Sequence, residues 1–150
     1  MTDPTSVAAV RALARASRLL ERASGELNLA HYRVLSAIAS GDERASWVAA
    51  RLALGKPTIS AAVDSLSQRG LITRTPTAED QRVAVLRLTA KGRAALDGVE
   101  TEMVARLQDL LARTPGGENL LDSLVWLGKA IDDRLAGKRH QFAEKNRSGR

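Results

Sequence analysis

The residues best suited to chemistry in this sequence lie at the start of one expected helix. Proline is common in the first turn of a helix, so Pro57 marks a helix that runs to about Arg69. Such a turn carries unpaired N–H groups and the positive end of the helix dipole, which favour a phosphate. Lys56 is the expected phosphate or guanine contact, and the small polar side chains allow a close approach. The residues expected to contact DNA here are Lys56, Pro57, Thr58, Ser60 and Ala61.

A second polar group lies on a hairpin expected after this helix. Alternating apolar residues predict strands over 71–74 and 82–88, and the segment between them, TPTAEDQ, is rich in turn formers. An arginine on a thin hairpin, here Arg82, can reach the narrow, electronegative minor groove of DNA. Asp80 can hold that arginine, or Arg74 on the facing strand, in a fixed geometry. The alternative is a surface ion pair of little energetic worth.

Helical periodicity supplies the elements that must position these residues. Gly70 is expected to end the helix that starts at Pro57, and Thr89 to cap the next one. The order of short helix, turn, helix, glycine and hairpin predicts a winged helix-turn-helix, although an all-α core has similar apolar spacing. The expected fold class is therefore mainly α with a small β-hairpin wing (α+β). Helices are expected over about residues 5–24, 30–39, 46–52, 57–69, 90–113 and 118–135.

The composition limits the possible classes of function. The chain has 150 residues, a formal net charge of +6 and a pI near 10.5, which suggests one domain with a polyanionic partner, either nucleic acid or an anionic membrane. It contains no cysteine, which excludes a disulfide framework, a thiolate metal site and a thiol-based redox sensor. Arg11 and Arg15 interrupt the first apolar stretch, and no apolar run approaches the roughly 18 residues of a membrane span. A soluble, cytoplasmic protein without a membrane partner is expected.

Other candidate sites have less support. His31 and His140 lack a carboxylate cluster at ligand spacing, so neither a metal site nor a cofactor is expected. No nucleophile elbow or partnered base is found, so we expect no enzyme. Trp47 and Trp126 are expected to be packing residues. One apolar face belongs either to the core of a single chain or to a dimer seam, and it consists of Leu120, Leu121, Leu124, Leu127 and Ile131.

Several motifs in order make the resemblance to a family specific. The segments KPTISAAVDSLSQRGLITR and EDQRVAVLRLTAKG look like the MarR family of bacterial transcription regulators. The match is strongest over about residues 46–93, and the flanking helices fit the family layout more loosely. The matching motifs are Thr58 to Ser60, Val63 to Leu66, Gly70 to Arg74, Asp80 to Arg82, and Leu88 to Gly92.

The resemblance implies a sequence-specific DNA-binding regulator, expected to be a dimeric repressor. Two recognition helices would read the half-sites of a near-palindromic operator in double-stranded DNA, and Arg82 would enter the minor groove. The resemblance also implies a single domain over 1–150. Its winged helix-turn-helix would cover about 30–93, its homodimer helices about 5–25 and 94–136, and a basic tail, frayed or disordered, about 137–150. A small phenolic or lipophilic effector is implied between the two parts, with its pocket residues unassigned.

Two departures from the family pattern shift the expected mode of DNA binding. Gly55 stands where the family commonly has a capping serine, and Ala61 stands where it often has arginine. We therefore expect fewer direct base contacts and more dependence on phosphates and groove shape. The alternative function is a winged-helix protein–protein adaptor without specific DNA binding. The basic charge and the pair of Asp80 and Arg82 favour the DNA-binding regulator.

Overall fold

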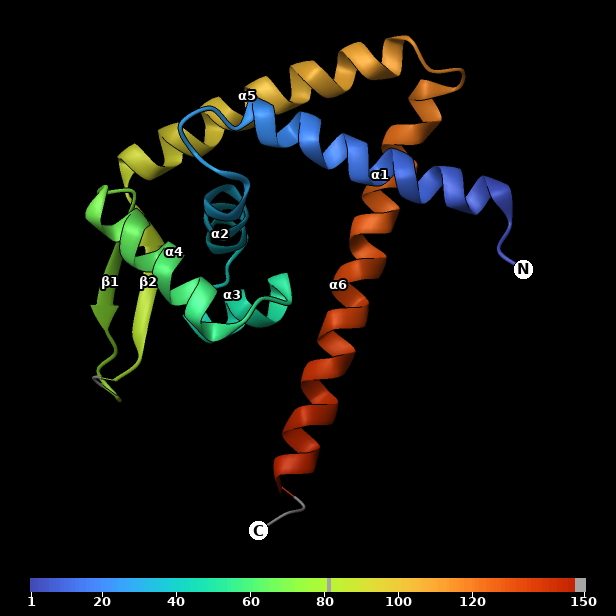
Figure 1. The fold of residues 1–150 in the computed structure, drawn as a ribbon. Helices are drawn as coiled ribbons and strands as arrows, with labels where there is room; N and C mark the ends of the chain where they lie inside the picture. The colour runs from blue at the N-terminus through green and yellow to red at the C-terminus, as the bar shows by residue number, and fades with distance from the viewer. Residues whose placement is uncertain (81, 148–150) are drawn as a thin grey trace.

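The described part of the chain contains six helices and one β-hairpin (Figure 1). The computed structural model describes the backbone of residues 1–80 and 82–147 and the side chains of residues 1–80 and 82–137. The elements are α1 (Pro4–Ala23), α2 (Leu29–Ala39), α3 (Ala45–Leu52), α4 (Lys56–Gln68), β1 (Ile72–Pro76), β2 (Ala84–Leu88), α5 (Ala90–Ala112) and α6 (Gly117–Arg147). Their order and type agree with the prediction.

The helix ends follow from local capping residues. Asp3 and Asn28 accept hydrogen bonds from backbone N–H groups in the first turns of α1 and α2. Thr89 caps α5 as predicted, because its Oγ1 accepts from the Gly92 N–H at 2.9 Å. Gly70 follows α4 with a φ of +70°, a left-handed conformation that favours glycine. These caps place the helix-turn-helix and the hairpin in the expected order.

Two boundaries differ from the prediction. Strand β2 begins at Ala84 rather than at residue 82, because the Val83 N–H donates to the Asp80 carbonyl in a turn. The last helix continues to Arg147, although its expected end was residue 135 with a basic tail beyond it. That segment contains no proline, and an isolated glycine such as Gly137 does not end a helix by itself.

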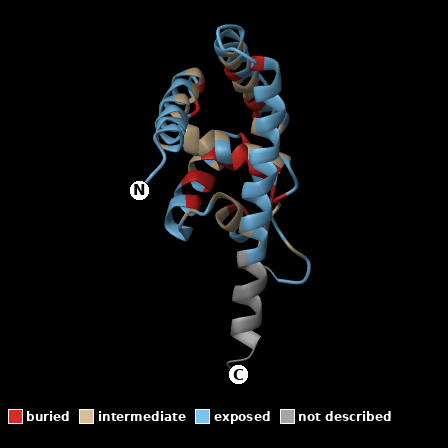
Figure 2. Cartoon of the chain, turned by 90° about the vertical axis from the view of Figure 1, so that its right-hand side faces the viewer, coloured by how far each residue is buried: buried red, intermediate tan, exposed pale blue. Residues whose placement is uncertain are grey.

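The core of the winged helix-turn-helix is built around α2. Its Val34 and Leu35 are fully buried and pack with Leu66 of α4, Leu86 of β2 and Leu96 of α5. Figure 2 shows most of the buried residues gathered in these central elements, whereas α6 is exposed over most of its described length. The antiparallel strands pair from Ile72 opposite Leu88 to Pro76 opposite Ala84, so the hairpin extends away from this core.

The junction between the wing and α5 depends on Gly92. A Cβ at this position would lie 1.8 Å from the Leu71 carbonyl oxygen, so only glycine permits the observed approach of the two backbones. The same junction carries a hydrogen bond from the Thr89 N–H to the Leu71 carbonyl. The start of α5 is thereby fixed against the segment that leads into β1.

Candidate nucleic-acid interface

The first turns of α4 present the predicted recognition residues to solvent. Lys56, Pro57, Thr58, Ser60 and Ala61 are all exposed. The opposite face of the helix is buried through its apolar stripe, which consists of Ile59, Ala62, Val63 and Leu66. The helix is thus oriented by its core face, and its small and basic face is available for a partner.

The glycine at the start of α4 has a direct structural effect. Gly55 is the N-cap residue, and no side-chain hydrogen bond caps this helix. The first backbone N–H groups of a helix lack acceptors within the helix. Because no capping side chain binds them here, these exposed N–H groups are available to an anion such as a phosphate oxygen. The departure from the family pattern therefore favours a backbone contact with phosphate.

The wing tip is ordered by Thr77 and Asp80. Thr77 Oγ1 donates to the Asp80 carbonyl at 2.7 Å and accepts from the Asp80 N–H at 3.1 Å. The Asp80 carboxylate accepts from the backbone N–H of Arg82 at 2.9 Å. The expectation that Asp80 holds an arginine side chain is therefore corrected, because it holds the backbone of Arg82 instead. The Arg82 side chain is exposed at the end of the hairpin.

Arg74 also has a different partner from the expected one. Its guanidinium donates to the carboxylate of Asp64 on α4, with an N–O distance of 2.5 Å. This ion pair joins the wing strand β1 to the outer face of the recognition helix. Asp64 lies within the matched Val63-to-Leu66 motif, yet periodicity alone does not reveal a contact between a helix and a strand. Arg74 therefore lies on β1, as expected, with its side chain beside α4.

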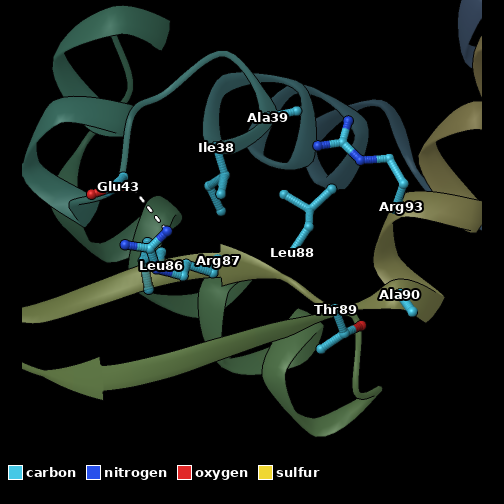
Figure 3. Close-up of a pocket in the computed structure, with 9 residues that line it drawn as sticks. All are labelled: Ile38, Ala39, Glu43, Leu86, Arg87, Leu88, Thr89, Ala90 and Arg93. Atoms are coloured by element: carbon cyan, nitrogen blue, oxygen red, sulfur yellow. Dashed lines mark ion pairs between the residues drawn. The ribbon is translucent and has the colours of Figure 1, made fainter.

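The base of the wing is attached to the helix-turn-helix on its other side. The Leu86 N–H donates to the Glu43 carbonyl at 2.7 Å, and the Arg87 guanidinium pairs with the Glu43 carboxylate at 3.3 Å. Figure 3 shows this pair at the edge of a pocket of about 390 Å³, with apolar side chains including Ile38 and Leu88 beside it. The backbone and the side chain of Glu43 therefore each hold strand β2 of the wing against the helix-turn-helix.

Two titratable side chains lie at the start of α2. Burial lowers the pKa of His31, and the nearby Arg69 charge lowers it further. The His31 Nδ1 atom is buried without a hydrogen-bond partner. Burial raises the pKa of Tyr32, and the Glu100 carboxylate adds to this rise. Tyr32 packs against the core on α2, the helix that contacts α5.

The flanking helices expose apolar side chains that a single chain leaves uncovered. Val125 and Trp126 of α6 are 72% and 67% exposed, and Trp47 of α3 is 41% exposed. The expectation that both tryptophans are packing residues is therefore wrong within one chain. The Leu-rich face of α6 is likewise largely exposed, so it is no core of the single chain. An apolar groove of about 560 Å³ lies between α1, α5 and α6, and its lining includes Leu13, Leu110 and Leu124.

Neither a membrane-spanning segment nor a metal cluster occurs among the described residues. Over residues 1–80 and 82–147, every helix is too short or too polar to cross a bilayer. Over residues 1–80 and 82–137, whose side chains are described, no three histidine or acidic side chains are grouped in a way that could hold a metal ion.

Comparisons with known proteins find similar transcription regulators. A family model described as the MarR family matches residues 26–83. The structure of CouR, a transcriptional repressor bound to a 23-mer DNA duplex, is 28% identical with a TM-score of 0.71, and the match covers 82% of this chain and 89% of CouR. PcaV from Streptomyces coelicolor, a transcriptional regulator in complex with its natural ligand, is 26% identical with a TM-score of 0.65, covering 86% and 92%. No curated protein matches the sequence.

A more distant structure agrees in fold. MarR from E. coli in its apo form is 19% identical with a TM-score of 0.70, covering 87% of this chain and 98% of that one. The predicted fold class, mainly α with a β-hairpin wing in a winged helix-turn-helix, is confirmed.

Proposed function

We propose that the protein is a homodimeric repressor of the MarR type, on the basis of the family model that matches residues 26–83 and the similarity to the DNA-bound repressor CouR. It binds a near-palindromic operator in double-stranded DNA, and a small molecule releases it. The observation that carries this proposal is the wing, whose tip backbone is fixed by Asp80 while the Arg82 side chain is exposed. A structural adaptor has no need of a fixed hairpin that presents an unshielded arginine.

Two surfaces would contact the same duplex. The first turn of α4 presents Lys56, Thr58 and Ser60 together with uncapped N–H groups, which suits the major groove and its phosphates. Arg82 on the wing suits the adjacent minor groove. The Arg74–Asp64 ion pair supports this arrangement, because it joins the wing to the recognition helix. The two surfaces would then bind as one rigid body.

The homodimer is supported by the apolar side chains that a single chain exposes. Large exposed apolar patches on a protein surface usually mark interfaces. Here they occur on α1, on the second half of α5 and on α6, and they include Val10, Leu13, Val104, Val125 and Ile131. A second copy of the chain is the occupant we propose, because a symmetric dimer presents one recognition helix to each half of a palindrome. The dimerisation region would then comprise α1 together with most of α5 and α6.

Release by a small molecule is supported by two relatives. CouR from Rhodococcus jostii RHA1 has been solved bound to p-coumaroyl-CoA, and that structure is 24% identical to this chain with a TM-score of 0.66, covering 84% and 92%. PcaV was solved with its natural ligand. For this chain we propose a phenolic or lipophilic effector between the dimerisation helices and the winged helix-turn-helix. Helix α2, which carries the partly buried Tyr32, contacts α5 and so joins these two parts.

The function can be tested by selecting DNA from a random duplex library with the full chain. We expect enrichment of a two-half-site sequence whose centres are about one helical turn apart. We also expect a plot of log affinity against log salt with a negative slope, because Lys56 and its neighbours release counterions from phosphates. A library without enrichment, together with a flat salt plot, would support the adaptor function instead.

A further inference from the structure

Arg51 lies in the last turn of α3, where it binds two carboxylates at once. Its Nη1 lies 3.4 Å from Oδ2 of Asp42, which is in the turn between α2 and α3. Its Nη2 lies 3.2 Å from Oδ2 of Asp132 on α6. The side chain of Asp42 is almost buried, that of Arg51 is partly buried, and that of Asp132 is half exposed. One guanidinium therefore connects the helix-turn-helix to α6.

The position of this contact in the fold gives it mechanical importance. Helix α6 begins beyond the far end of α5 and returns past α3, as Figure 1 shows. Helix α6 contacts α3, and α3 in turn packs against the recognition helix α4. Because α4 follows α3 after a turn of only three residues, 53–55, any shift of α3 against α6 would also move α4.

We propose that Arg51 is a positioning residue for DNA binding, which sets the orientation of the helix-turn-helix relative to α6. The inference rests on the proposed homodimer, in which α6 belongs to the shared core. Two recognition helices must then be held at one fixed separation to reach both half-sites of a palindrome. A guanidinium suits this role, because its planar fork can donate to two carboxylates in a fixed geometry, which an ammonium group does not do.

A positioning role differs measurably from an ordinary surface ion pair. The Arg51–Asp132 arm ends on a half-exposed carboxylate, and such pairs contribute little to folding stability, so its loss in Asp132→Asn is expected to leave the melting temperature nearly unchanged. It is expected to affect DNA that carries two half-sites, because only such DNA requires a fixed separation. DNA with a single half-site requires only one helix-turn-helix, and its binding is expected to stay the same.

The first experiment removes the charge on α6. Asp132→Asn keeps the shape of the side chain, and we expect it to weaken binding to a selected two-half-site duplex about fivefold. The matched control is Asp133→Asn, which removes the same charge one residue further along α6. Combining Asp132→Asn with Arg51→Met should weaken binding no more than Arg51→Met does alone, because the two residues act through each other. Additive losses, or an equal loss on single half-site DNA, would overturn the inference.

The second experiment measures helix positions without DNA. The chain has no cysteine, so spin labels can be placed at Gln68→Cys on α4 and Ala130→Cys on α6, two exposed positions. Dilution with unlabelled chain restricts the measured distance to one protomer. We expect a narrow distribution that broadens or shifts with Asp132→Asn but not with Asp133→Asn. An unchanged distribution contradicts the positioning role, whereas a failure to select any DNA would count against the proposed function alone.

Discussion

The winged helix-turn-helix and the helices that flank it differ in where their apolar side chains are covered. Between Leu27 and Leu96, most large apolar side chains are covered within one chain and several are fully buried, although Trp47 is 41% exposed. Helix α1 has no buried residue, and α6 exposes most of its large apolar side chains over its described length. Both regions have the same helical pattern in the sequence. The difference teaches that one region has its own core, whereas the other requires a second surface.

The strongest test of the core of the winged helix-turn-helix is Gly92→Ala. The new Cβ would collide with the Leu71 carbonyl oxygen, which is backbone and cannot rotate away, so we expect the free energy of unfolding to fall by about 3 kcal/mol. Urea denaturation measures this loss. The control is Gly98→Ala on the same helix, which meets nothing within 4 Å and should stabilise the chain, by at most about 1 kcal/mol. Equal stability of the two variants would show that the wing junction is not closely packed.

The exposed apolar surface of the flanking helices is tested by Val125→Glu. This side chain is 72% exposed, so the substitution leaves the packing of one chain intact but places a charge in the proposed dimer interface. Burial of an unpaired carboxylate is costly, and we expect self-association to weaken about a hundredfold or more. Light scattering should change from a dimer to a single 16.1 kDa chain. The control, Asn119→Glu, adds the same charge early in α6 and should remain dimeric. A dimeric Val125→Glu variant would exclude the face that carries Val125 from the dimer interface.

Arg82→Ala tests whether the winged helix-turn-helix contacts DNA through its wing. The substitution removes an exposed side chain, so stability should not change, whereas affinity for the selected operator should fall about tenfold to a hundredfold. Gel-shift titration measures the change. Arg33→Ala, which removes an exposed arginine from α2, serves as the control. Unchanged operator affinity in the Arg82 variant would remove the wing from the interface.

The smallest expected effect concerns His31, which lies where the two regions meet. Its pKa is lowered in the folded chain, so the unfolded chain binds the proton more readily. The contribution of His31 to the free energy of unfolding is therefore complete above the ordinary imidazole pKa of 6.5. It is lost as the pH falls below that value. We expect the melting temperature to fall less on acidification in His31→Gln than in the parent chain. An equal fall in the two chains would contradict this contribution of His31.

Local chemistry explains what the sequence could predict. Helix caps, the left-handed Gly70 and the period-two strands depend on neighbouring residues, so the order of elements and the exposed face of α4 followed from spacing. The contacts of Arg74 with Asp64 and of Arg51 with Asp132 join distant elements, and no period in the sequence records them. The motif glycine at position 92 could be recognised, but its reason, the adjacent Leu71 carbonyl, exists only in three dimensions.

Periodicity also leaves open which surface an apolar face meets. The leucines of α6 have the spacing of a core helix, and the sequence was compatible with a core or a dimer seam. Only the exposure of Leu121, Leu127 and Ile131 in the folded chain favours the second alternative. The tryptophans were misplaced for the same reason, because an aromatic side chain predicts burial without specifying by what.

The hydrogen bond from the Arg82 N–H to Asp80 has a consequence for the entropy of recognition. A loop that becomes ordered on binding loses backbone freedom, which costs roughly 1–2 kcal/mol for each residue. Here that freedom is already lost at Arg82 before any duplex arrives, because the carboxylate fixes the backbone. The guanidinium keeps its rotamers and can adapt to grooves of different width. Such a wing combines a small ordering cost with tolerance of sequence, so discrimination between operators would fall mainly to the first turns of α4.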